Sequence, residues 1–164
     1  SYELSFNASK VDLTSFNNLK KLEIRTALDS FDSFQAIMKL MNLSEDTKGF
    51  LDITVNSVDQ LKELFQICTF LKEKNMIKFC VKLRNLDKDI FLKEFHSFLG
   101  AAHSGSISMQ IKTGLSLELD EMKQIGDKLR NSKGLIELLR LMAKSGLIVY
   151  NRKNDHLVIT SFGK

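Results

Sequence analysis

The chain has 164 residues, of which 43% are hydrophobic and 27% are charged, a composition typical of globular domains. This length allows one domain or two small ones with a sizeable core. There is no proline and no run of about 18 apolar residues, which argues against proline-rich linkers and a transmembrane helix. The first residues lack a basic stretch followed by an apolar one, so we expect no signal peptide and a location in the cytoplasm, nucleoid or nucleus.

Residues 1–86 have the pattern of a small α/β unit. A short strand is expected over 2–6, helical stripes over 13–19 and 28–41, and a polar loop over 42–49. Strict alternation predicts a strand over 51–55. Ser57, with Gln60 three residues later, predicts a capped helix that continues to about Leu71. A further strand is expected over 76–83, with Ile77, Phe79 and Val81 on one face and Lys78, Cys80 and Lys82 on the other.

Residues 87–164 have a more specific order of elements. A helix over 87–99 is expected to be followed by a loop of small residues over 100–105 and a strand over 106–112. Ser116 is expected to cap a helix that continues to about residue 129, and Ser132 a further helix over 132–145 that stops at Gly146. Two strands, 147–150 and 156–160, are expected to form a hairpin around a polar turn.

This order resembles the winged helix-turn-helix superfamily. The segment 115–129 looks like the first helix of the motif, 132–144 is similar to the recognition helix, and the hairpin 147–159 looks like the wing. The expected fold is therefore α+β with two domains: the α/β unit over 1–86 that the pattern indicates, and the winged-helix domain over 87–164 that the resemblance implies. The pattern does not distinguish a dimerisation unit, a ligand sensor and a second DNA-contacting domain as the role of residues 1–86. The alternative for residues 1–86 is a second, degenerate winged helix, as in plasmid replication initiators.

The resemblance implies contact with duplex DNA through the third helix and the wing, as in a transcriptional regulator or a replication or partition factor. The charge distribution agrees, because residues 128–164 contain eight Lys and Arg residues against two acidic ones. On this interpretation the nucleic-acid-binding residues are Arg130, Lys133, Arg140, Lys144, Arg152 and Lys153. Arg140 is suited to a guanine edge, and Lys133 and Lys144 to phosphates.

A second function is consistent with the same pattern. Glu137 lies in the middle of the basic stripe, where it would repel phosphate, and the expected helix over 132–145 is apolar around most of its circumference. An apolar arc of this width is typical of a protein contact. The alternative is therefore a winged-helix interaction or assembly module, with a homodimer or another protein against this helix. Salt-dependent binding to duplex DNA distinguishes the two functions.

No catalytic, cofactor or metal site is expected. The three histidines are far apart in the sequence, and no cysteine pair has the spacing of a zinc site. The glycine-containing loop 100–105 follows a helix, whereas a phosphate cradle follows a strand. Cys68 and Cys80 lie in apolar patterns, which favours buried thiols over a disulfide or a catalytic thiol. The protein is not expected to be an enzyme.

Overall fold

The computed structural model describes residues 3–4, 21–27, 31–41, 46–101, 105–132, 134 and 136–163. These residues form an eight-stranded sheet whose strands follow one another in chain order. The strands are β1 (Glu3–Leu4), β2 (Lys21–Ala27), β3 (Asp46–Val55), β4 (Met76–Leu83), β5 (Ser106–Thr113), β6 (Ile136–Ala143), β7 (Gly146–Asn151) and β8 (His156–Ser161). The helices are α1 (Phe31–Met41), α2 (Val58–Thr69), α3 (Lys88–Gly100) and α4 (Leu119–Asn131).

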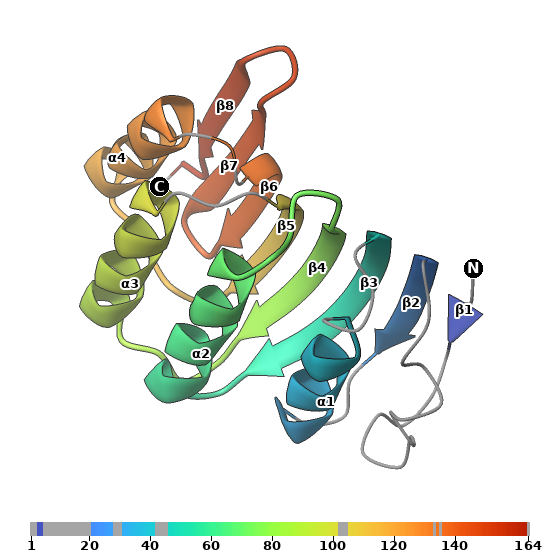
Figure 1. Ribbon diagram of the computed structural model, residues 1–164. Helices are drawn as coiled ribbons and strands as arrows, with labels where there is room; N and C mark the ends of the chain where they lie inside the picture. The colour runs from blue at the N-terminus through green and yellow to red at the C-terminus, as the bar shows by residue number, and fades with distance from the viewer. Residues whose placement is uncertain are drawn as a thin grey trace.

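Strands β1 to β6 are parallel, and β6, β7 and β8 are antiparallel. The helices lie on one face of the sheet, as Figure 1 shows. Register partners are 28 residues apart between β3 and β4 (Ile53 and Val81) and 30 apart between β4 and β5 (Val81 and Ile111). One strand and one helix therefore repeat with a nearly constant period, which is the architecture of a solenoid.

The core lies between the helices and the covered face of the sheet. Alternate residues of β3, β4 and β5 are buried there, including Ile53, Phe79 and Ile111. The helices contribute a cluster of stacked rings, in which Phe65 and Phe98 have centroids 4.3 Å apart. Burial of one such side chain contributes about 1.5–3 kcal/mol to folding.

Side-chain caps fix where two of the helices begin. The hydroxyl of Ser57 accepts a hydrogen bond from the Gln60 amide at 3.2 Å, and the Gln60 side chain accepts one from the Asn56 amide. The carboxylate of Asp87 accepts hydrogen bonds from the Asp89 and Ile90 amides at 3.1 and 3.2 Å. These bonds satisfy amides that have no partner within the helix, so each helix starts at a defined residue.

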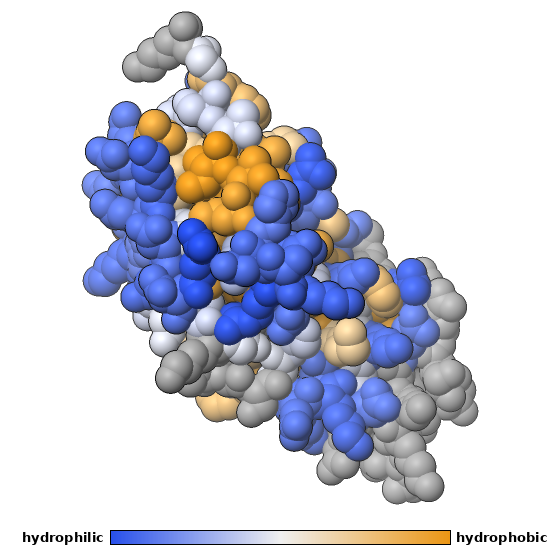
Figure 2. Space-filling view, turned by 90° about the horizontal axis from the view of Figure 1, so that it is seen from above, coloured by the Kyte–Doolittle hydropathy of each residue, from blue (hydrophilic) through white to orange (hydrophobic). Residues whose placement is uncertain are grey.

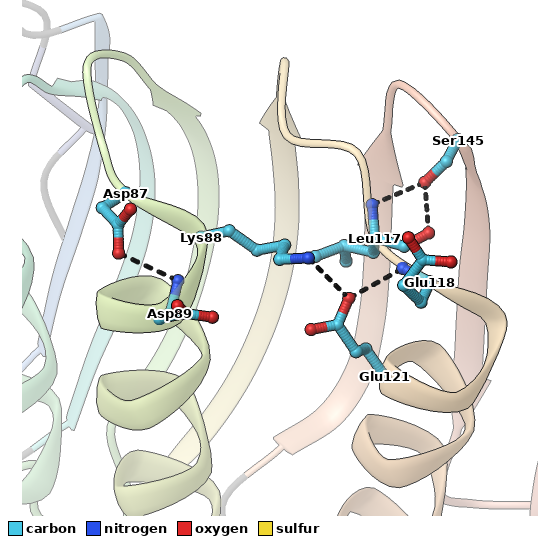
Figure 3. Close-up of polar contacts among 7 residues, drawn as sticks. All are labelled: Asp87, Lys88, Asp89, Leu117, Glu118, Glu121 and Ser145. Carbon is cyan, nitrogen blue, oxygen red and sulfur yellow. Dashed lines mark hydrogen bonds and ion pairs between the residues drawn. The ribbon is translucent and has the colours of Figure 1, made fainter.

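Figure 3 shows the polar contacts that join the starts of α3 and α4 to the turn between β6 and β7. The Leu117 amide donates to the Ser145 hydroxyl, which in turn donates to the Leu117 carbonyl, both at 2.7 Å. Lys88 forms an ion pair with Glu121 at 3.2 Å. A hydrogen bond from the Glu118 amide, together with Lys88, lowers the pKa of the Glu121 carboxyl. This end of the fold is therefore held by several polar contacts between consecutive units.

The predicted recognition helix over 132–145 is wrong, because residues 136–143 form strand β6. Ile107 pairs with Ile136 but Ser108 pairs with Leu138, so Glu137 is an extra residue in a β-bulge. The bulge places Ile136 and Leu139 on the same covered face, three residues apart. A spacing of three in a segment rich in Leu, Met and Ala is typical of a helix, which explains the error. No helix follows α4 in the described residues, so they contain no helix-turn-helix.

Two further boundaries differ from the prediction. The expected loop over 42–49 is wrong at its end, because β3 begins at Asp46. Helix α4 begins at Leu119 after Glu118, and Ser116 is not its cap. Of the expected strand over 2–6, residues 3–4 form β1, and the stripe over 13–19 lies outside the described residues. The boundary expected between residues 86 and 87 falls inside one continuous sheet, since β4 pairs with β5.

Candidate functional site

The predicted DNA-contacting residues do not lie along one helix edge. Arg140 is in the middle of β6, where its register partners are Gln110 and Val149. Lys144 is in the turn at the end of β6, where its amide donates to the Leu115 carbonyl at 2.9 Å. Because 136–143 is an extended strand, Arg140 and Lys144 are not neighbours one helical turn apart.

The remaining predicted residues lie near the turn between β7 and β8. Arg130, near the end of α4, forms an ion pair with Asp155 at 3.3 Å. The Nη2 atom of Arg152 donates to the Ser132 carbonyl at 2.6 Å, and its Nη1 atom is buried without a hydrogen-bond partner among the described atoms. Lys153 is an exposed residue of the turn, and Lys133 lies outside the described residues. Arg130 and Arg152 are thus engaged in contacts within the fold.

The face of the sheet opposite the helices, which we call the open face, is covered by no described element. It extends over β2 to β8 and consists of the residues that alternate with the core. Three register rows cross it: Phe50, Lys78, Ser108, Leu138, Asn151; then Asp52, Cys80, Gln110, Arg140, Val149, Val158; then Thr54, Lys82, Lys112, Met142, Leu147, Thr160.

The described side chains of the open face carry more positive than negative charge. The basic residues are Arg25, Lys48, Lys78, Lys82, Lys112 and Arg140, and the acidic ones are Glu23, Asp46 and Asp52. At the β2 side, the charge is locally compensated, since Arg25 pairs with Glu23 at 3.0 Å and lies 3.9 Å from the centre of the Phe50 ring. Toward β4, β5 and β6 the basic residues dominate.

The open face becomes apolar over the antiparallel strands. Its apolar residues there are Leu138, Met142, Leu147, Val149 and Val158, alongside the polar Arg140, Asn151 and Thr160. Leu138 on β6 and Val158 on β8 are 42% and 37% exposed. With Met142, Leu147 and Val149 they bring apolar side chains together on three adjacent strands, and such a grouping is typical of an interaction surface. Figure 2, which views the molecule from above, shows one patch of apolar side chains bordered by hydrophilic ones. We call these five apolar residues the apolar strip.

A hollow of about 430 Å³ lies on the open face across β3, β4 and β5. Its polar lining consists of Asp52, Thr54, Cys80, Lys82, Gln110 and Lys112. Partial burial, and then the charge and hydrogen bonding of Asp52, raise the pKa of the Cys80 thiol. A raised pKa keeps this thiol protonated at neutral pH, which is the opposite of what a nucleophilic cysteine requires.

Other site types have no support in the part of the chain that the structure describes. No group of three or more His, Cys, Asp or Glu side chains among these residues can hold a metal ion. Cys68 is fully buried, and its burial raises its pKa. None of the described helices is long and apolar enough to cross a membrane.

The residues of the hollow were not among the predicted site residues, although the sequence contained a signal for them. The alternation in 76–83 placed Lys78, Cys80 and Lys82 on a second face, and 106–112 has the same pattern. Parallel strands that are covered on both faces are apolar at nearly every position. Polar residues at alternate positions of successive strands that are separated by helices therefore indicate a parallel sheet with one uncovered face.

Comparison with known proteins adds no further constraint: no protein-family model, curated protein or solved structure matches this chain.

Proposed function

We propose that this protein is an interaction module that binds another protein through the open face of its sheet. The observation that carries the proposal is a sheet whose strands β1 to β6 are parallel and whose described helices all lie on one face (Figure 1). Parallel sheets are ordinarily covered on both faces, because the helices of their βαβ crossovers pack against them. Solenoid repeats are an exception, and their extended surfaces serve to bind partners.

The composition of the open face favours a protein partner. The apolar strip offers contiguous aliphatic side chains, with Leu138 and Val158 the most exposed. Arg140 lies on β6 beside the apolar strip, Lys112 lies on the adjoining β5, and Lys82 lies one strand further on β4. All three are suited to acidic groups. Protein interfaces combine an apolar centre with a polar rim, whereas DNA-binding surfaces are more polar and much more positively charged. The expected occupant is a segment with both aliphatic and acidic side chains.

Binding without catalysis is the function that these residues support. The Cys80 thiol is kept protonated by burial and Asp52, and no histidine is among the residues of the hollow. A nucleophilic cysteine would need an adjacent base or a lowered pKa. A transcriptional or replication role through duplex DNA is the competing function, and it requires the basic residues of the open face to contact phosphates.

Selection from a library of random peptides tests the proposal. The immobilised protein is used for selection, and the L138D/V158D/R140E variant for counter-selection. Peptides enriched in aliphatic and acidic residues should bind the wild type and slow the alkylation of Cys80, which is the exposed thiol at the centre of the open face. Enriched peptides that bind the variant equally well, or leave the alkylation rate of Cys80 unchanged, would contradict the proposal.

Random-sequence duplex DNA is the second arm of the same experiment. If DNA is the occupant, it should slow Cys80 alkylation, and its affinity should fall with salt with a logarithmic slope of about −0.9 per phosphate contact. Protection of Cys80 by duplex DNA at physiological salt, without protection by any selected peptide, would replace the protein partner with DNA.

A further inference from the structure

We propose that the hollow across β3, β4 and β5 is a carboxylate-binding subsite, in which Lys82 and Lys112 hold an acidic side chain of the partner. The inference rests on the proposed function and specifies the chemistry of one position within it. The hollow is lined by both lysines and has a volume of about 430 Å³, which is ample for the end of a glutamate or aspartate side chain.

The placement of the two lysines is the first step. Lys82 and Lys112 are register partners on neighbouring parallel strands. Such strands lie about 4.8 Å apart, and like charges at directly opposite positions destabilise a sheet. Neither lysine forms an ion pair with any side chain that the structure describes. An anion bound between them would convert this repulsion into two favourable contacts.

The other polar groups of the hollow complete the set of donors. Thr54 is the register partner of Lys82 on β3, and Gln110 precedes Lys112 by two residues on β5. A hydroxyl, an amide and two ammonium groups can together satisfy the lone pairs of one carboxylate, which accepts up to about four hydrogen bonds. Hydrogen bonds between ions of this kind are stronger than neutral ones.

The charge of Asp52 favours a carboxylate over a phosphate monoester. Asp52 lines the same hollow, and it acts on Cys80 through its charge and a side-chain hydrogen bond. Two lysines and one aspartate leave a single net positive charge. One carboxylate matches this charge, whereas a phosphate monoester with nearly two negative charges would leave the site negative.

Cys80 provides a reporter inside the hollow. It is the exposed one of the two cysteines, while Cys68 is fully buried. The rate of Cys80 alkylation by iodoacetamide is measured at low salt with increasing hexaglutamate, blocked at both ends, and with hexaglutamine as the uncharged control. Because Lys82 and Lys112 also affect the reactivity of the thiol, each variant is compared with itself in the presence and absence of peptide.

Hexaglutamate should protect Cys80 in the wild type, and hexaglutamine should not. The K82Q/K112Q variant should bind hexaglutamate about tenfold more weakly, since two charge-assisted contacts are lost. The K82R/K112R variant should retain binding. The matched control is K93A/K123A, which removes two exposed lysines from α3 and α4 on the covered side and should leave protection unchanged. Continued burial of Cys68 in each variant shows that the fold is intact.

Two results would overturn the subsite. One is the absence of protection by hexaglutamate in the wild type, and the other is equal protection in the wild type and in K82Q/K112Q. Neither result would refute a protein partner, because peptides selected from the library are tested against the apolar strip. Conversely, if hexaglutamate binds through the lysines but no selected peptide binds the open face, the subsite stands and the proposed function fails.

Discussion

The two faces of this sheet are built from the same strands but have different surroundings. On the covered face, Ile53, Phe79 and Ile111 are almost completely buried against the helices. On the open face, the residues next to them in the sequence are Thr54, Cys80 and Lys112, all of which line an open hollow. A step of one residue along a strand therefore moves from a side chain in the core to a side chain on the open face, because successive side chains point to opposite faces.

We therefore expect stability and the proposed binding to depend on different residues. Substitutions on the covered face remove packed apolar contacts, and their cost should appear in the free energy of unfolding. Substitutions on the open face change groups that contact solvent, and their cost should appear in binding. Substitutions on one face should therefore leave the property of the other face unchanged.

The two thiols give the largest expected contrast, because one lies on each side of the sheet. Cys68, with no exposed surface, should react with iodoacetamide only when the protein opens, at least about a thousandfold more slowly than a free thiol. Cys80 should react in the native state, and its rate should continue to rise above pH 9 because its pKa is raised from 9.0. Mass spectrometry of timed samples assigns each site.

Asp52 provides the control for the behaviour of Cys80. Its negative charge and hydrogen bond raise the pKa of the thiol, so D52N should lower that pKa and increase the rate of alkylation at pH 8. The rate at Cys68 should not change in this variant. Similar rates at both thiols in the native wild type would mean that the two faces are not distinct in solution.

A substitution in the ring cluster should have the next largest effect. Phe95 is fully buried, with its ring 5.3 Å from that of Phe91 and 5.9 Å from that of Phe65. F95A should lower the free energy of unfolding by about 3–5 kcal/mol, measured by urea denaturation. The matched open-face variant K48A should change it by less than about 0.5 kcal/mol. A loss in K48A comparable to that in F95A would contradict the assignment of the two faces.

Substitution of Gly146, at the start of β7, should have a smaller effect on stability, with Gly114 as the control. A β-carbon on Gly146 would lie 2.4 Å from the Thr160 carbonyl oxygen and 2.7 Å from Met122 Cε, so G146A requires the strands or α4 to shift. Overpacking of this kind costs about 1–3 kcal/mol. At Gly114 a β-carbon would meet nothing within 4 Å, so G114A should be neutral within about 0.5 kcal/mol. Equal denaturation midpoints for the two variants would contradict the close pairing of β7 with β8.

Several elements could be predicted from local pattern alone. The strands β4, β5, β7 and β8 and the helices α2 and α3 lie where the sequence predicted them. Their signals are strong: β4 and β5 alternate regularly, a polar turn separates the apolar runs of β7 and β8, and Ser57 and Asp87 cap the helix starts. These signals depend on neighbours within a few residues, which is why they can be read without the rest of the molecule.

The error at β6 had a tertiary cause. The bulge at Glu137 breaks the period of two, and it exists only because β6 pairs with β5. A helix over 132–145 is what makes the order of elements resemble a winged helix, and it places Arg140 and Lys144 on one helix edge. The candidate site moved accordingly from the edge of a helix to the face of a sheet.

The sequence by itself determined which side chains alternate on each strand and where most helices begin, because both depend on backbone geometry over short distances. Only the tertiary structure decided that successive strands join one sheet in chain order and that the described helices all pack against the same face. The open face brings Lys82 next to Lys112, although they are far apart along the chain. Their proximity depends on long-range strand pairing and on the helices covering the opposite face, which short-range patterns do not specify.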